Sequence, residues 1–112
     1  MKKQLFNLLL IVTILLPLNS FSQTLGGTIT GVVRDQSTGE TMPGVNVVIE
    51  GTLRGASTGP DGEFTITGVA PGTYRLSLTL ISYKPVRVEG VEVRTGSVSV
   101  INVAMSDQSV EL

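Results

Sequence analysis

The chain has 112 residues, with no cysteine, no histidine and no tryptophan, and its formal net charge at pH 7 is −1. The lack of cysteine excludes disulfides, thiolate metal sites and thiol nucleophiles, and the lack of histidine removes the commonest general base and zinc ligand. Only carboxylates, hydroxyls and two tyrosines remain to carry any reaction.

The first 22 residues have the layout of a signal peptide. Lys2 and Lys3 form a short positive start, an uncharged apolar run follows from Leu8 to Leu16, and Pro17 ends the run. The alternative is a transmembrane anchor, but the apolar run is shorter than the roughly 20 residues that a span requires. We therefore predict that residues 1–22 are a cleaved signal peptide.

Small residues before the expected cut place it between Ser22 and Gln23, with a cut one or two residues away as the alternative. We expect the exported product to work in the periplasm or in association with the outer membrane. Residues 23–112, 90 in all, suffice for one domain. They carry six basic and nine acidic residues, so nucleic acid is not an expected partner.

After a short leader, residues 23–27, apolar residues alternate with polar ones and no helical stripe occurs. The first predicted strand ends in the polar loop 35–41, where Gly39 can adopt positive φ. A turn at Pro43 and Gly44 begins the second strand. The residues predicted to point inward from these two strands are Ile29, Gly31 and Val33, then Val45, Val47 and Ile49.

Two further turns follow a short segment at 56–58. Pro60 precedes Asp61 and Gly62 in a predicted tight hairpin, with glycine in the left-handed region. Pro71 and Gly72 open the longest alternating run, which we predict to be a central strand. The inward residues of these strands are predicted to be Phe64 and Ile66, then Tyr74, Leu76, Leu78 and Leu80.

The alternation slips by one residue in each of the last two predicted strands. Val88 and Val91 lie on either side of the first slip, which predicts a β-bulge or bend at Gly90. In the last strand Val98 and Val100 differ in parity from residues 101, 103 and 105. This strand either bulges near Val100 or is covered on both faces, and we expect the polar tail, residues 106–112, to be frayed.

About seven short strands with frequent turn signals predict an all-β, Ig-like or transthyretin-like sandwich over residues 28–105. Glycine, proline and strand residues recur at characteristic spacing in segments 31–35, 39–40, 43–47, 51–52, 55–58, 61–64 and 72–74. Together these segments resemble the carboxypeptidase regulatory-like domain, and with the predicted signal peptide in front of them the chain is similar to the N-terminus of SusC-like TonB-dependent outer-membrane receptors. Serine stands at position 82, where the family usually has glycine.

The resemblance implies an interaction module with a protein partner at the outer membrane, either the receptor's plug and barrel or the energising complex. In such receptors a TonB-contacting box, a plug and a barrel follow the domain, whereas this sequence ends at Leu112. We expect the chain to be the leading piece of a longer receptor or a free-standing copy of the domain.

Candidate chemical groups are few, and each has a structural explanation. Asp35, Asp61 and Glu63 are not clustered along the chain as six or more calcium ligands require. Asp35 and Glu40 bracket one loop, but no nucleophile or oxyanion motif accompanies them. We therefore predict no catalytic, cofactor or metal residues, and structural roles for the turn residues Pro43, Gly44, Asp61, Gly62, Pro71 and Gly72.

Two other functions are compatible with parts of the sequence. A free-standing module could bind a carbohydrate or peptide through aromatic residues, but only Phe64, Tyr74 and Tyr83 follow the signal peptide. Tyr74 is expected in the core, which leaves Tyr83 as the candidate surface contact. A transthyretin-like hydrolase would rely on histidines and a C-terminal Tyr-Arg-Gly-Ser sequence, and both are missing.

Overall fold

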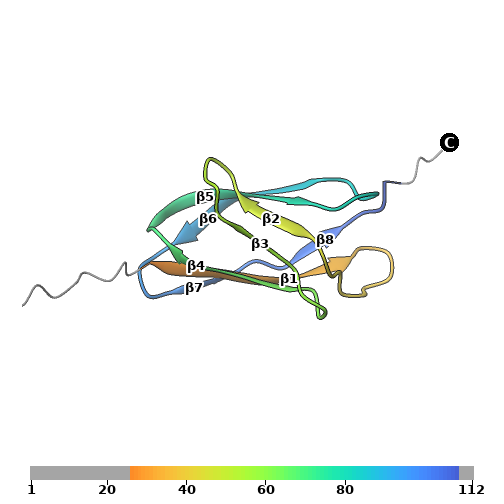
Figure 1. Ribbon diagram of the computed structural model, residues 1–112, viewed down its shortest axis with the longest axis horizontal. Helices are drawn as coiled ribbons and strands as arrows, with labels where there is room; N and C mark the ends of the chain where they lie inside the picture. Colours follow the sequence, from red (N-terminus) through yellow and green to blue (C-terminus); the bar gives the residue numbers. More distant parts are fainter. Residues whose placement is uncertain (1–25, 109–112) are drawn as a thin grey trace, which may run out of the picture.

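The computed structural model describes residues 26–108, which form an all-β sandwich of two sheets (Figure 1). The predicted signal peptide, its cut between Ser22 and Gln23, and residues 23–25 of the leader lie outside these residues. Within them no helix occurs, and hence none that is long and apolar enough to cross a bilayer. The predicted fold class is confirmed.

Eight strands make up the sandwich, one more than the approximate prediction. In chain order they are β1 (Gly27–Asp35), β2 (Asn46–Ile49), β3 (Gly55–Ser57), β4 (Glu63–Val69), β5 (Gly72–Thr79), β6 (Val86–Val93), β7 (Val98–Val100) and β8 (Val103–Met105). The alternation predicted that β5 would be the longest strand, but β1 is longer, with nine residues against eight.

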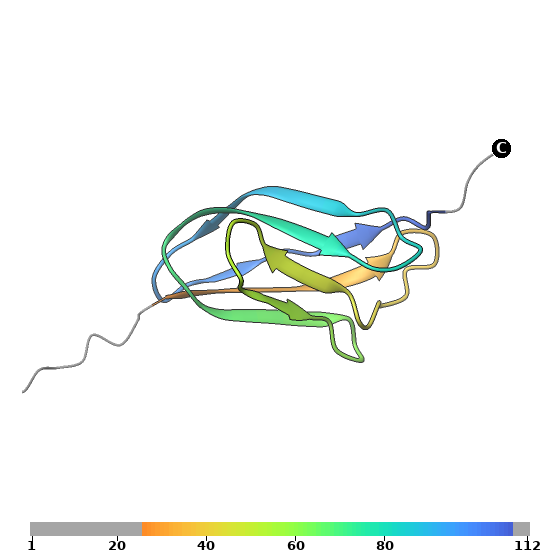
Figure 2. The same ribbon diagram turned by 45° about the horizontal axis from the view of Figure 1, so that its top comes forward.

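One sheet has the order β4-β1-β7, with β8 also paired to β1, and the other has the order β3-β2-β5-β6. Strand β5 is therefore an interior strand, as predicted. The pairing of β1 with β7 and β8 is parallel, whereas the other pairs are antiparallel. The chain consequently enters the sandwich at one end and leaves at the other, as Figures 1 and 2 show. We call these the N-terminal end and the C-terminal end.

The space between the sheets is filled by the alternating apolar residues. Phe64 and Leu76 are almost completely buried, and each such side chain stabilises the fold by about 1.5–3 kcal/mol relative to an exposed one. Tyr74 is half-buried against this core, and its hydroxyl donates to the carbonyl of Ala70. Buried core residues that were predicted to point inward are Ile29, Val33, Val45, Val47, Ile49, Phe64, Ile66, Leu76 and Leu78. Val91, Val93 and Met105 are buried in the same core.

The slip predicted at Gly90 is a β-bulge. Tyr74 of β5 pairs with Val91 of β6, while Leu76 pairs with Val88, so two residues of β6 lie opposite Arg75. Gly90 has a φ of 70°, a left-handed conformation that glycine adopts without a steric cost. The bulge restores an inward direction for the last two valines of β6.

The last predicted strand was assigned wrongly. It is divided into β7 and β8, and the register against β1 is the same in both: Thr28 lies opposite Val98, and Val33 lies opposite Val103. No bulge is inserted, and Val98 and Val100 are 61% and 62% exposed, so the strand is not covered on both faces. The division has a local cause, because the side chain of Asn102 takes over a ladder position and accepts the backbone N–H of Val32 at 3.1 Å.

The tail does not fray at its beginning. The N–H of Lys84 donates to the carbonyl of Ser106 at 2.9 Å, and the N–H of Gln108 donates to the carbonyl of Ser82 at 2.8 Å. Tyr83 and Asp107 form an antiparallel bridge between them. Residues 106–108 thus cross from the β1 sheet to the β5–β6 turn and join the two sheets at the C-terminal end.

The β5–β6 turn contains a strained residue. Ser82, with a φ of 73°, is the one non-glycine residue of the described chain at positive φ. Its turn is closed by the N–H of Tyr83, which donates to the carbonyl of Leu80 at 3.1 Å. A side chain in the left-handed region costs about 1–2 kcal/mol, which explains why glycine suits this position.

Replacing Ser82 with glycine is expected to raise the free energy of unfolding by about 0.5–1 kcal/mol. The backbone strain that is relieved is larger than the stability lost because glycine makes the unfolded chain more flexible. Chemical denaturation followed by circular dichroism measures the change. Ser82→Ala is the matched control: it keeps the Cβ and should bring no gain. A glycine variant less stable than the natural chain would contradict this account of the turn.

Candidate functional site

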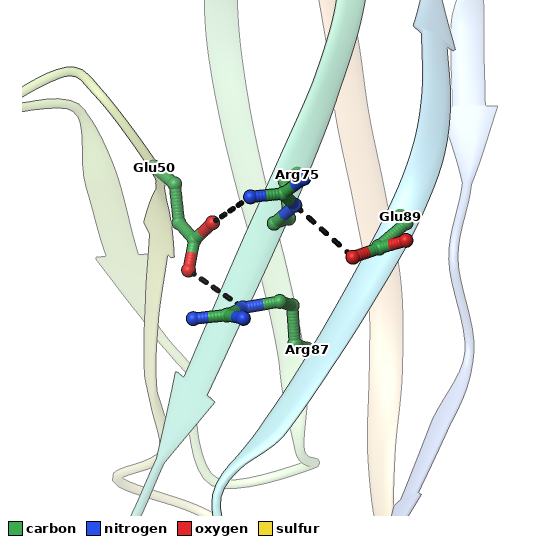
Figure 3. Close-up of polar contacts among 4 residues, drawn as sticks. All are labelled: Glu50, Arg75, Arg87 and Glu89. Carbon is green, nitrogen blue, oxygen red and sulfur yellow. Dashed lines mark hydrogen bonds and ion pairs between the residues drawn. The ribbon is translucent and has the colours of Figure 1, made fainter.

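Four charged side chains gather on the outer face of the β2-β5-β6 sheet, and we call this set the charged face (Figure 3). Glu50 directly follows β2, Arg75 lies on β5, and Arg87 and Glu89 lie on β6. Their neighbours on these strands point into the core, so alternation turns them toward solvent. Because Glu50 follows β2 and the other three residues lie on β5 and β6, only the folded sheet brings them together.

Glu50 is the centre of the charged face. Its carboxylate accepts Nε of Arg87 at 2.9 Å and Nη1 of Arg75 at 3.4 Å. Nε of Arg75 lies 3.3 Å from a carboxylate oxygen of Glu89. The four side chains therefore form a chain of alternating charge with no net charge, and their exposure means that each pair contributes little to stability.

An open hollow of about 630 Å³ lies beside the charged face. The bulge at Gly90 forms part of its wall, together with Glu50, Arg75 and Glu89. The residues that line it supply charged and hydroxyl groups, without a thiol or an imidazole. This arrangement suits polar contact with another molecule.

A second polar group lies at the C-terminal end, where Asp35 ends β1. One carboxylate oxygen accepts the N–H groups of Ser37 and Thr38 at 2.8 and 3.2 Å, which closes the loop that follows. The other accepts the hydroxyl of Tyr83 at 2.6 Å. Asp35 thus ties its own loop to the β5–β6 turn, 48 residues away in the sequence. These hydrogen bonds hold the loop and the turn together.

These contacts change the acidity of both groups. The hydrogen bond from Tyr83, followed by the one from the Ser37 N–H, lowers the pKa of Asp35 below its ordinary 3.8. The bond to Asp35 in turn raises the pKa of Tyr83 above its ordinary 10.0. Both shifts favour a carboxylate that accepts and a phenol that donates. Neither group is thereby prepared for proton transfer near neutral pH.

Replacing Tyr83 with phenylalanine is expected to raise the pKa of Asp35 toward 3.8, because its chief cause of depression is removed. A depressed carboxyl pKa contributes stability that is complete above the ordinary pKa and is lost as the pH falls through the folded value. The variant should therefore be less stable at neutral pH and should lose stability less steeply in acid.

Carbon-detected NMR titration of the Asp35 carboxyl group tests this directly. Tyr74→Phe is the matched control, because the hydroxyl of Tyr74 donates to a backbone carbonyl and leaves Asp35 untouched. An Asp35 midpoint that is the same in the natural chain and in Tyr83→Phe would contradict the assignment.

The structure also exposes apolar side chains that the sequence pattern did not single out. Leu53 projects from the β2–β3 hairpin with full exposure, and Ile81 from the β5–β6 turn with 90% exposure. The two lie at opposite ends of the sandwich, because β2 and β5 are antiparallel. Their signal in the sequence was an apolar residue inside a turn, where the alternation of strands does not apply.

The predicted turn residues have the following places. Pro43 and Gly44 lie in the turn before β2, and Asp61 and Gly62 lie in the turn before β4, where the N–H of Gly62 donates to the carbonyl of Gly59 at 2.9 Å. Pro71 lies at the bend between β4 and β5, and Gly72 is already the first residue of β5. Among residues 26–108, no three acidic side chains are grouped so that they could hold a metal ion.

Comparison with known proteins identifies the family. The profile of the carboxypeptidase regulatory-like domain family matches residues 28–106. The chain belongs to the carboxypeptidase regulatory-like domain family. The matched range covers nearly all of the sandwich, so the domain contains both the charged face and the Asp35–Tyr83 contact.

Two larger proteins contain segments similar to this carboxypeptidase regulatory-like domain. The TonB-dependent receptor SusC of Bacteroides thetaiotaomicron is 36% identical over 78 residues, which are 70% of this chain and 7% of the receptor. Carboxypeptidase D of Anas platyrhynchos is 28% identical over 75 residues, which are 67% of this chain and 5% of that protein. The chain therefore spans only a small part of either relative.

Solved structures agree with the fold. A chain of a type II cohesin–X-dockerin complex from Acetivibrio cellulolyticus has a TM-score of 0.63 and 27% identity, covering 71% of this chain and 57% of that one. The pilus 2b backbone protein of group B streptococcus has a TM-score of 0.54 and 22% identity, covering 74% of this chain and 42% of that one. The second likeness concerns the fold alone.

Proposed function

We propose that this domain is a non-catalytic protein-interaction module in the N-terminal extension of a TonB-dependent outer-membrane nutrient receptor. The similarity to SusC carries the proposal, because it covers most of the sandwich and SusC is a TonB-dependent receptor. The predicted signal peptide supports it, since such a receptor must be exported. The partner is then the receptor's own plug and barrel or the energising complex.

The geometry of the domain supports an interaction role over a catalytic one. The four residues of the charged face neutralise one another, and Asp35 is held as an acceptor by Tyr83 and two backbone groups. Exposed Leu53 and Ile81 offer apolar contacts at the two ends. The domain thus presents contact surfaces without a group tuned for chemistry.

The alternative of a glycan-binding module has less support. Of the three aromatic side chains in the sandwich, Phe64 is buried. The hydroxyls of Tyr74 and Tyr83 are already engaged with Ala70 and Asp35, and both rings pack against the core. No stacking platform is formed by the described residues, so the protein-interaction role is preferred.

Fractionation of the source cells tests the proposal. An antibody raised against residues 23–112 should detect a protein several times larger than this chain in the outer-membrane fraction. A soluble periplasmic product with the mass of residues 23–112 would contradict the receptor role. Titration calorimetry with oligosaccharides provides the control for the alternative, and the proposal predicts no heat of binding.

A further inference from the structure

Strand β7 forms an open edge of the β1 sheet. The N–H of Thr28 donates to the carbonyl of Ser97 at 2.9 Å, and the N–H of Ile101 donates to the carbonyl of Thr30 at 2.8 Å. Alternate residues of a strand bond to the same neighbour, so the backbone groups of Val98 and Val100 point away from β1. Within residues 26–108 no strand pairs with that side of β7.

The β7 edge is short, but it lacks the charges, prolines and bulges with which proteins also protect open edges. Edge strand β6 carries the bulge at Gly90 and two members of the charged face, and edge strand β4 begins with Glu63. By contrast, residues 95–106 contain no charge and no proline. Two valines, 61% and 62% exposed, stand at the residues whose backbone groups are free.

We propose that two copies of the domain associate through β7, pairing antiparallel about a twofold axis at Ser99. The segment Val98–Ser99–Val100 reads the same in both directions, so Val98 of each copy lies opposite Val100 of the other. Each such pair can exchange two backbone hydrogen bonds, and the four valines then form one apolar patch on the outer face. A twofold interface requires this kind of self-complementary surface.

The charges around the edge favour a second copy as the occupant. The nearest charged residues on β6 and in the loop that follows, Glu92 and Arg94, lie 3.7 Å from each other. Because they neutralise each other, two copies approach without like-charge repulsion. The β7 edge is only three residues long. Pairing through it therefore buries far less than the roughly 1,200 Å² of surface that a stable complex requires. The dimer is therefore weak and depends on concentration.

Sedimentation equilibrium of residues 23–112, which include the whole described sandwich, tests the proposal from roughly 20 µM to about 1 mM. The dimer fraction should rise over this range. Val100→Lys removes apolar contacts and adds like charges, so it should weaken association about tenfold or more. Thr65→Lys is the matched control: it adds the same charge on the outer face of the same sheet, at the opposite edge strand, and should leave association unchanged.

A second variant separates backbone pairing from adhesion of the side chains. Val98→Pro removes an N–H that points away from β1, so the sandwich should fold, as an unchanged circular dichroism spectrum would show, while the dimer is lost. Amide hydrogen exchange at Val98 and Val100 should also slow as the concentration rises. A monomer throughout the concentration range overturns the proposal, as does a dimer that both edge variants leave intact.

Discussion

Replacing Gly31 with alanine is expected to destabilise the domain by about 3 kcal/mol, an unusually large effect for one added methyl group. A Cβ at this position would lie 1.7 Å from the carbonyl oxygen of Ile101 and 2.9 Å from the ring of Phe64. The first contact is with backbone, so no change of rotamer relieves it. Strand β1 would have to move away from the segment between β7 and β8.

The free energy of unfolding from urea denaturation measures this effect, and Thr28→Ala serves as the control. Thr28 lies on the same strand with its side chain on the outer face, so the loss there should stay within about 0.5 kcal/mol. Equal stabilities of the two variants would show that β1 and Ile101 are not in close contact.

Replacing Phe64 with alanine is expected to cost about 3–5 kcal/mol, because it removes the largest fully enclosed side chain and leaves a cavity between the sheets. Phe64 is 2% exposed and lies on β4 opposite Gly31. A small domain has only about 5–15 kcal/mol of stability, so a large share would be lost.

Thermal unfolding followed by circular dichroism would show the loss as a strongly lowered melting temperature. Thr65→Ala, the exposed neighbour on the same strand, should change it little. A Phe64→Ala variant that melts close to the natural chain would mean that the two sheets are not packed on this ring.

The fold could be predicted where period-two alternation has one buried face. In β2 and the residue before it, Val45, Val47 and Ile49 were expected inside and are buried. The slip in parity on either side of Gly90 was sufficient to locate the bulge, because an inserted residue reverses the face of every residue after it. Local patterning and local backbone geometry carry this information.

Alternation could not resolve the last part of the chain. Val98 and Val100 have the same apolar character as the inward residues, although they face solvent, so the pattern could not distinguish an open edge from a covered strand. The engagement of residues 106–108 with 82–84 is also invisible, since backbone hydrogen bonds leave no compositional trace.

The candidate surfaces depended still more on tertiary structure. The Asp35–Tyr83 contact joins residues 48 positions apart, and the charged face joins the end of β2 to β5 and β6. Each residue alone resembles an ordinary polar position of a strand or loop. Their proximity follows from the order of the strands in each sheet, which the sequence pattern does not specify.

Photo-cross-linking in the source cells is the most direct test of an interaction module. A photoreactive residue is placed in turn at Leu53, Ile81 and Glu89, which sample both ends and the charged face. We expect at least one position to yield a covalent cross-link, either within the receptor, to its plug or barrel, or to the energising complex. If no position in the folded domain yields an adduct, the proposed role is contradicted.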